Sequence, residues 1–282
     1  MKISVVVYKA FVSDRGGGNP AGIVFSETPF RVDEMQATAG EMALSETAFI
    51  TPCGHTCFRL RYFTPLREVP LCGHATIAAW TWLAREKNIP PGIYTQETDS
   101  GSLAIEVTEQ GDIFMEQAPP SFGPEVDGEE IAESLGLPGG SLHERYPVQL
   151  VSTGLPDIIV PLADLSLLAR IRPDFKKIET LSQKYKCVGY HVFAFGERET
   201  LAHCRNFAPA VGILEEAATG TASGALAVYL ARYHFPDQRD LDLTFLQGAE
   251  MGEPSTIRAR IIQGELRVGG KALYSETRTI TL

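Results

Sequence analysis

The chain has 282 residues, of which 44% are hydrophobic and 21% charged, and its formal net charge is -10. A nucleic-acid surface needs clustered Lys and Arg, so this acidic balance speaks against one. No stretch approaches the roughly 20 apolar residues that cross a bilayer. The length suggests about two domains, each able to bury a core.

The N-terminal half predicts several strands around two helices. One helix, over residues 31–44, carries apolar residues at helical spacing, with Asp33 as its expected N-cap. The other, over residues 75–87, is nearly all apolar and is therefore expected to be buried on most sides. The expected strands are residues 3–11, 21–25, 46–51 and 58–64, followed by a hairpin over 102–117 that turns at Gln110–Asp112.

The five cysteines are odd in number and irregularly spaced, which fits free thiols better than a disulfide framework. No signal-peptide core precedes the first strand, so we expect a cytoplasmic protein. Cys53 and Cys57 suggest a metal, but no second ligand pair at zinc spacing accompanies them. The sequence therefore predicts no metal site.

Two segments of the chain resemble each other. "GNPAGIVF" from Gly18 is similar to "GLPDIIVP" from Gly154, and a Phe-x-Pro phrase precedes a Gly-initiated apolar helix in both halves, at Gly73 and at Gly220. The matches occur in the same order along the chain, which indicates an internal duplication. The segment 118–130 is rich in Pro, Gly and acids and is the expected linker.

The predicted fold is α+β: two similar domains, each a mostly antiparallel sheet wrapped around a central helix, with the site in the interdomain cleft. The expected domains are 1–120 and 121–270, and the last strand, about 271–282, returns to the first domain. Helix N-termini bind anions, and glycine lets a ligand approach the backbone. Both helix starts are therefore expected to hold a small carboxylic acid.

These motifs resemble the phenazine-biosynthesis PhzF-like family, which has the diaminopimelate epimerase fold. The resemblance covers essentially the whole chain, through "GNPAGIVF", "EMALSETAFI", "EVPLCGHATIAA" and "NFAPAVGILEEAATGTASGALAVYL". It implies a cofactor-independent isomerase that transfers a proton on a small carboxylic acid. It also implies a homodimer.

The resemblance assigns the general acid/base role to Glu46 and further catalytic roles to His74 and Glu216. Glu216 stands where the family usually has Asp, and Thr221 stands where the family has Ser. Substrate binding is expected from Gly73 and Gly220, with Thr221 and Asn19 beside them.

Cys72 leaves two alternatives open. Epimerases of this fold use one cysteine from each domain, and Cys72 matches the first position, whereas Thr219 stands at the second. Threonine cannot replace a thiolate base, so racemisation by two thiols is not expected, although an epimerase or racemase that uses Cys72 remains an alternative. A non-catalytic ligand-binding protein on the same fold is the other alternative, because of the substitutions at Glu216 and Thr221.

Overall fold

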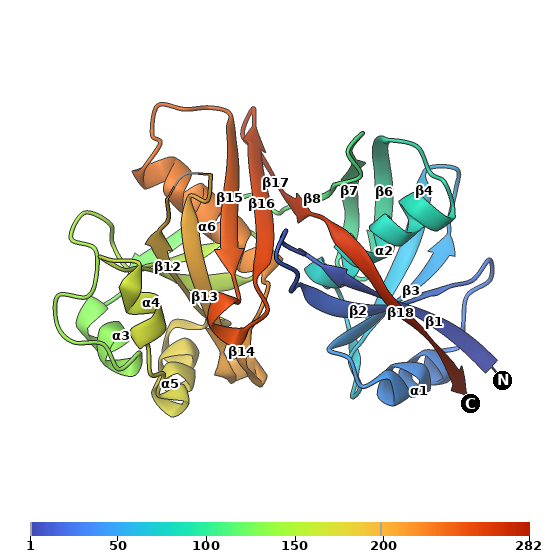
Figure 1. Ribbon diagram of the computed structural model, residues 1–282, viewed down its shortest axis with the longest axis horizontal. Coiled ribbons are helices and arrows are strands. Elements are labelled where there is room, and N and C mark those ends of the chain that lie inside the picture. The colour runs from blue at the N-terminus through green and yellow to red at the C-terminus, as the bar shows by residue number, and fades with distance from the viewer. Residues whose placement is uncertain (1, 198) are drawn as a thin grey trace. The chain divides into compact units, whose positions relative to one another are not determined.

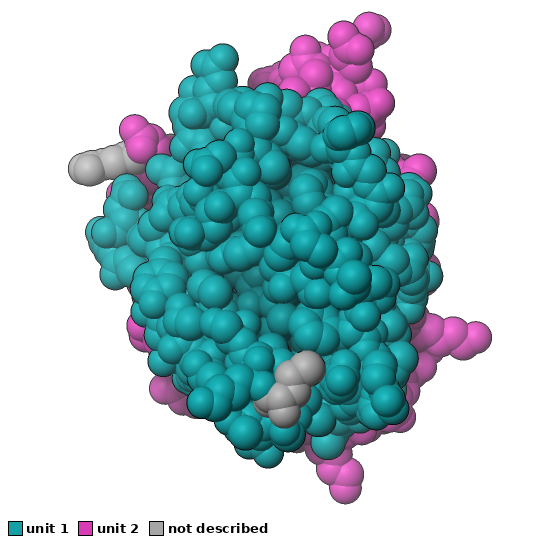
Figure 2. All heavy atoms as spheres, turned by 90° about the vertical axis from the view of Figure 1, so that its right-hand side faces the viewer, with its two compact units in different colours: residues 1–116, 269–282 teal, residues 117–268 magenta. Residues whose placement is uncertain are grey.

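The computed structural model describes residues 2–197 and 199–282, which divide into two compact units (Figure 2). Unit 1 comprises the chain up to Glu116 together with Gly269–Leu282, and unit 2 comprises Gln117–Val268. The sequence places these boundaries near residues 120 and 270. Because β18 (Ala272–Thr281) pairs antiparallel with β1 (Lys2–Ala10), the C-terminal strand belongs to unit 1.

Unit 1 is a mixed sheet with two helices, α1 (Val32–Met42) and α2 (Gly73–Glu86) (Figure 1). Most neighbouring strands run antiparallel, but β2 is parallel to β3 and β4 is parallel to β6. Besides β1 and β18, the strands are β2 (Asn19–Phe25), β3 (Glu46–Pro52), β4 (Cys57–Phe63), β5 (Glu68–Val69), β6 (Gly92–Thr98), β7 (Gly101–Val107) and β8 (Ile113–Glu116).

The nearly all-apolar sequence of α2 explains its central place in unit 1. The sheet surrounds the helix (Figure 1), and Trp80 is fully buried against Phe58 and Tyr94. The indole N–H of Trp80 donates to Gln96 Oε1 at 2.6 Å, so the polar atom of this large side chain is satisfied inside the core. This confirms the sequence prediction of a helix buried on most sides.

Helix α1 packs on the opposite face of the sheet, where Met35, Ala39 and Met42 join a buried apolar cluster. The prediction that Asp33 is the N-cap of α1 is wrong. The helix begins after Arg31, whose backbone N–H donates to Glu34, and Asp33 lies in the first turn, paired with the Arg31 guanidinium at 2.8 Å. An acid in the first turn still favours the helix through its dipole.

Unit 2 repeats this plan with more helices. Its sheet encloses α6 (Gly220–Tyr233), and α3 (Gly128–Ser134), α4 (Ser166–Arg170) and α5 (Phe175–Tyr185) cover the other face, where they pack on a large apolar cluster. The strands are β9 (Ser121–Glu125), β10 (Gln149–Ser152), β11 (Pro156–Pro161), β12 (Gly189–Phe195), β13 (Ala202–Ala208), β14 (Ile213–Glu216), β15 (Leu241–Gln247), β16 (Ser255–Ile262) and β17 (Glu265–Gly270).

The pairing of the strands follows the same order in both units. The parallel pair β2–β3 corresponds to the parallel pair β11–β12, and the antiparallel pair β3–β4 corresponds to β12–β13. A partly buried ion pair recurs as well: Arg61 pairs with Glu68 at 2.6 Å, and Arg205 pairs with Glu215 at 2.8 Å. The internal topology therefore agrees with the duplication that the sequence indicates.

Two sequence expectations are wrong in detail. The expected linker at 118–130 contains β9 and the start of α3, because β9 pairs with β10 and so extends the sheet of unit 2. Cys53 and Cys57 are joined by a disulfide, because the hairpin between β3 and β4 brings their Cα atoms to 5.1 Å. Cys72, Cys187 and Cys204 are free thiols.

Within the described residues, no helix has the length and apolarity needed to cross a membrane.

Candidate active site

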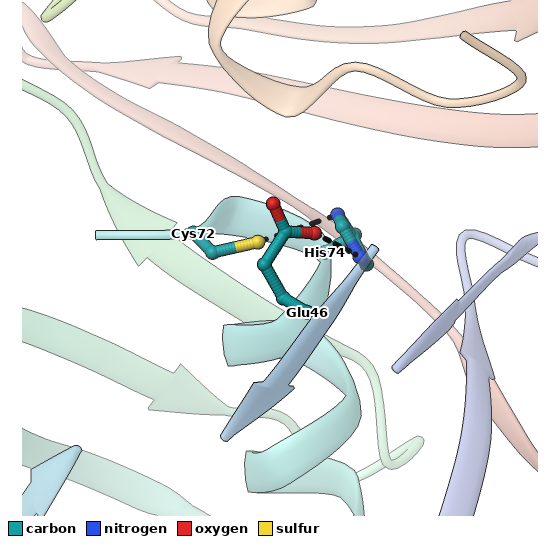
Figure 3. Close-up of side chains that lie close together, drawn as sticks. All are labelled: Glu46, Cys72 and His74. Atoms are coloured by element: carbon teal, nitrogen blue, oxygen red, sulfur yellow. Dashed lines mark hydrogen bonds and ion pairs between the residues drawn. The ribbon is translucent and has the colours of Figure 1, made fainter. Parts of the chain in front are cut away.

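Three chemically active side chains of unit 1 meet where α2 begins (Figure 3). Glu46 is the first residue of β3, Cys72 is the N-cap of α2, and His74 is in the first turn of that helix. Glu46, at the beginning of β3, lies on the sheet face that packs on α2, because the alternate residues Thr47 and Phe49 point to the face of α1. The fold thus brings together two motifs that are 26 residues or more apart in the sequence.

His74 lies between the other two side chains. Its Nδ1 is 3.4 Å from Cys72 Sγ, and its Nε2 is 3.3 Å from Glu46 Oε2 and 3.3 Å from Ser45 Oγ. The imidazole is almost fully buried, and this burial lowers its pKa although the Glu46 carboxylate acts in the opposite direction. His74 is therefore neutral at neutral pH, and its contact with Glu46 is not an ion pair.

The Glu46 carboxylate has an oxygen with no donor. Oε2 is buried and accepts no well-aligned hydrogen bond from any described residue. A buried acceptor without a partner is costly, so this oxygen gains from any hydrogen-bond donor that a ligand brings.

Gly73 opens α2 without any steric need for glycine. A Cβ built there meets only Met115 Cε, at 3.9 Å, and the residue has no left-handed φ angle. Neither the packing nor the backbone conformation of unit 1 therefore requires glycine at this position.

Glu46, Cys72 and His74 offer ligand atoms that lie within 4.8 Å of one another, and all three residue types bind zinc. However, His74 directs Nδ1 to Cys72 and Nε2 to Glu46. One ion bound to a single ring nitrogen therefore cannot also reach both neighbours in this arrangement. Cys53 and Cys57, which the sequence raised as a possible metal pair, are in a disulfide and offer no thiolate.

Asn19 is buried at the start of β2, on the α2 side of the sheet.

Unit 2 gathers its own set of side chains where α6 begins. Thr219, the N-cap, donates its hydroxyl to Glu216 Oε2 at 2.6 Å. Gln247 donates to the Glu216 carbonyl at 2.7 Å and to Thr219 Oγ1 at 3.0 Å. The Glu216 carboxylate is thereby held in place beside Gly220 and Thr221, the first two residues of the helix.

The neighbouring Glu215 has a different role. Both of its carboxylate oxygens accept hydrogen bonds from Arg205 at 2.8 Å. This bidentate pair corresponds to Arg61 with Glu68 in unit 1, so Glu215 is bound to the sheet, whereas Glu216 is held by Thr219 at the start of α6.

Three polar side chains around these helix starts were not predicted from the sequence. Ser45 Oγ lies 3.3 Å from His74 Nε2, Gln247 donates to the Glu216 carbonyl, and Asp157 is buried in β11. Only Asp157 carried a usable signal: it is a charged residue in the repeat segment "GLPDIIVP", at the position that corresponds to Ala21. Ser45 and Gln247 look like ordinary strand-end residues.

The chain is similar to known proteins over almost its whole length. The model of the phenazine biosynthesis-like protein family matches residues 8–278. The uncharacterized isomerase YfhB of Bacillus subtilis is 34% identical over 290 residues, which cover 99% of this chain and 98% of that protein. The trans-2,3-dihydro-3-hydroxyanthranilate isomerase of Pseudomonas chlororaphis is 30% identical over 262 residues, which cover 90% and 89%.

Solved structures agree with these relatives. The crystal structure of a PhzF-family phenazine biosynthesis protein from Bacillus anthracis superposes with a TM-score of 0.90 at 29% identity, and each chain is fully covered. A hydroxyproline epimerase from Agrobacterium vitis shares the fold alone, with a TM-score of 0.62 at 10% identity over 99% of this chain and 92% of that one. The α+β fold expected from the sequence is thereby confirmed, and the chain belongs to the phenazine biosynthesis-like family of isomerases.

Proposed function

We propose that the protein is a cofactor-independent isomerase that moves a proton within a small carboxylic acid, with Glu46 as the general acid/base. The observation that carries this proposal is the buried Glu46 Oε2, which has no hydrogen-bond donor and lies 3.3 Å from a neutral His74. The carboxylate can take a proton from a substrate carbon and return it at another position, so no cofactor is required.

The first turn of α2 is suited to hold the carboxylate of the substrate. Its first N–H groups have no acceptor within the 14-residue helix, and Gly73 leaves room beside the backbone. His74 is neutral and can donate or accept one hydrogen bond without adding charge. We propose that it orients the substrate against Glu46.

Unit 2 offers a second helix start of the same kind. Gly220 and Thr221 open α6, and Glu216 is fixed there by Thr219. We propose that Gly220 and Thr221 bind the substrate and that Glu216 helps to orient or polarise it. The longer side chain of Glu216 is accommodated by its hydrogen bond to Thr219.

For the substrate we propose an unsaturated cyclic or branched carboxylic acid. The name of the Pseudomonas chlororaphis relative identifies a substrate of this chemistry, trans-2,3-dihydro-3-hydroxyanthranilate. Such an acid combines an anionic group for the helix start with an acidic C–H bond for Glu46.

The test is proton exchange in heavy water. The wild-type protein is incubated with trans-2,3-dihydro-3-hydroxyanthranilate, and with a pool of small carboxylic acids, and deuterium uptake is measured by mass spectrometry. Glu46→Gln is expected to lower the exchange by about 100-fold or more, the usual size of a general acid/base contribution. Glu68→Gln is the matched control, because Glu68 is a partly buried acid of the same unit that pairs with Arg61. Undiminished exchange in Glu46→Gln would refute the role of Glu46.

A thiol mechanism is the second candidate, because Cys72 Sγ lies 3.4 Å from His74 Nδ1. A cysteine beside a histidine can be activated as a base in an epimerase. The equivalent N-cap of α6 is Thr219, which favours proton transfer with a single thiol at most. Full activity of Cys72→Ser excludes this route, whereas its loss, together with protection of Cys72 by substrate against alkylation, supports it.

A further inference from the structure

Asp157 is a buried carboxyl group for which the proposed mechanism has no role. It is 2% exposed, and its Oδ1 has no hydrogen-bond partner among the described residues. Its neighbours in β11, Ile158 and Val160, point into the apolar cluster on the side of α3, α4 and α5. Because side chains alternate along a strand, Asp157 points to the opposite face, on which α6 lies.

The register of the sheet relates Asp157 to Glu46. In unit 1, Glu46 on β3 stands opposite Ala21 on β2. In unit 2, the corresponding parallel pair places Gly189 on β12 opposite Asp157 on β11. Each unit therefore has one carboxyl group on this rung beside the buried helix, but the acid comes from the other strand of the pair.

Steric crowding explains why β12 carries no acid at this level. A Cβ at Gly189 would lie 2.0 Å from the carbonyl oxygen of Phe207, so no side chain fits at the position that corresponds to Glu46. The adjacent strand can carry an acid at this level instead, at position 157. A carboxyl group beside the start of the central helix is thus a feature of both units.

Glu216 is the charged group whose field acts on Asp157. Burial, together with a smaller contribution from the nearby Glu216 carboxylate, raises the pKa of Asp157 to about 8. The other titratable neighbours are uncharged at neutral pH: His191 on β12, whose pKa burial lowers to about 3, and the thiol of Cys187, whose pKa burial raises to about 11. The strand β10 and the first turn of α6 contribute only uncharged residues.

We propose that Asp157 and Glu216 form an acid–base pair at the start of α6, in which Asp157 keeps its proton while Glu216 is ionised. This inference rests on the proposed function, for which the pair has a clear consequence. The start of α6 then presents one negative charge to an anionic substrate at neutral pH and two in alkaline solution. Asp157 is a positioning residue, because it acts through the charge of the Glu216 site.

The pair is tested first without substrate. Aspartate and glutamate are labelled with carbon-13 at the side-chain carboxyl, and the NMR signals of Asp157 and Glu216 are assigned with Asp157→Asn and Glu216→Gln. We expect the Asp157 signal to be that of the protonated acid at pH 7. Its titration midpoint should move to lower pH in Glu216→Gln and should stay unchanged in Glu215→Gln, the matched control whose carboxylate faces Arg205. The proposal is overturned if Asp157 is ionised at pH 7, or if the titration midpoint of Asp157 is the same in Glu216→Gln as in the wild-type protein.

The second test uses deuterium exchange into trans-2,3-dihydro-3-hydroxyanthranilate at pH 7 and pH 9. Wild-type protein should show a KM about tenfold higher at pH 9, the scale expected of a like charge near a bound anion. Asp157→Asn, which imitates the neutral acid, should keep its pH 7 value of KM at pH 9. Identical pH profiles of wild type and Asp157→Asn overturn the inference and leave the role of Glu46 intact. Absence of exchange in every protein counts against the proposed function, and the NMR titration then decides the pair on its own.

Discussion

The substitution Asp157→Asn should make the protein more stable in neutral and alkaline solution. Asp157 has a pKa of about 8 in the folded protein, against 3.8 for an unperturbed side chain. Between these two values the folded state holds one proton that the unfolded state has lost, so the free energy of unfolding falls as the pH rises. Below the pKa that Asp157 has in the unfolded state, both states hold the proton, and Asp157 no longer makes the free energy of unfolding depend on pH.

The magnitude follows from the size of this pH interval. One pKa unit corresponds to about 1.36 kcal/mol, so three units from pH 5 to pH 8 correspond to about 4 kcal/mol for this fully buried group. Asparagine has nearly the same shape and does not ionise. The wild-type protein should therefore lose about 4 kcal/mol relative to Asp157→Asn over this interval.

The assay is urea denaturation at pH 5, 6, 7 and 8, with the free energy of unfolding obtained by linear extrapolation. The quantity to compare is the difference between the two proteins at each pH, because all other titrating groups cancel. A difference that stays constant from pH 5 to pH 8 would falsify the assignment of a proton to Asp157. Asp112→Asn, a second buried acid, provides the control for a general effect of losing a carboxylate.

Three further predictions concern glycine, the disulfide and assembly. Gly73→Ala should fold normally, because its Cβ meets only Met115 at 3.9 Å, but it should raise KM in the exchange assay. Gly189→Ala should instead lower the free energy of unfolding by more than about 2 kcal/mol, because its Cβ would overlap the Phe207 carbonyl. Equal effects of the two substitutions would contradict the ligand role of Gly73. Reduction of the Cys53–Cys57 disulfide, which closes a short loop with a sequence separation of 4, should cost about 2 kcal/mol in urea denaturation and leave exchange activity unchanged; loss of activity would connect this hairpin to the site. The homodimer implied by the family resemblance stays a prediction, and light scattering coupled to size-exclusion chromatography measures it directly.

The sequence was sufficient for the overall architecture because its strongest signals are local. The apolar run from Ala75 to Leu83 is too uniformly hydrophobic for a surface helix, and the paired motifs at Gly73 and Gly220 identify the two helix starts. Glu46 and His74 are brought together by the structure at 3.3 Å, a proximity that the family resemblance implied but that spacing along the chain does not reveal.

The remaining features depend on tertiary contacts. Whether Cys53 reaches Cys57 is decided by the geometry of one hairpin, and whether Glu215 or Glu216 pairs with Arg205 depends on which of them faces that guanidinium. The burial of Asp157, and with it the shift of its pKa, requires the register of β11 against β12 and the position of α6. No pattern of residue types along the chain encodes these relationships.

The pairing of β1 with β18 has a consequence for biosynthesis. Residues from Lys2 to Ala10 pair with residues 272–281, so β1 lacks one of its two neighbouring strands until residues 272–281 have been translated. Residues 117–268 form a continuous unit and can fold while the C-terminus is still being translated. Unit 1 therefore becomes fully native later than unit 2, although most of unit 1 is translated earlier, and deletion of residues 272–281 should damage unit 1 rather than unit 2.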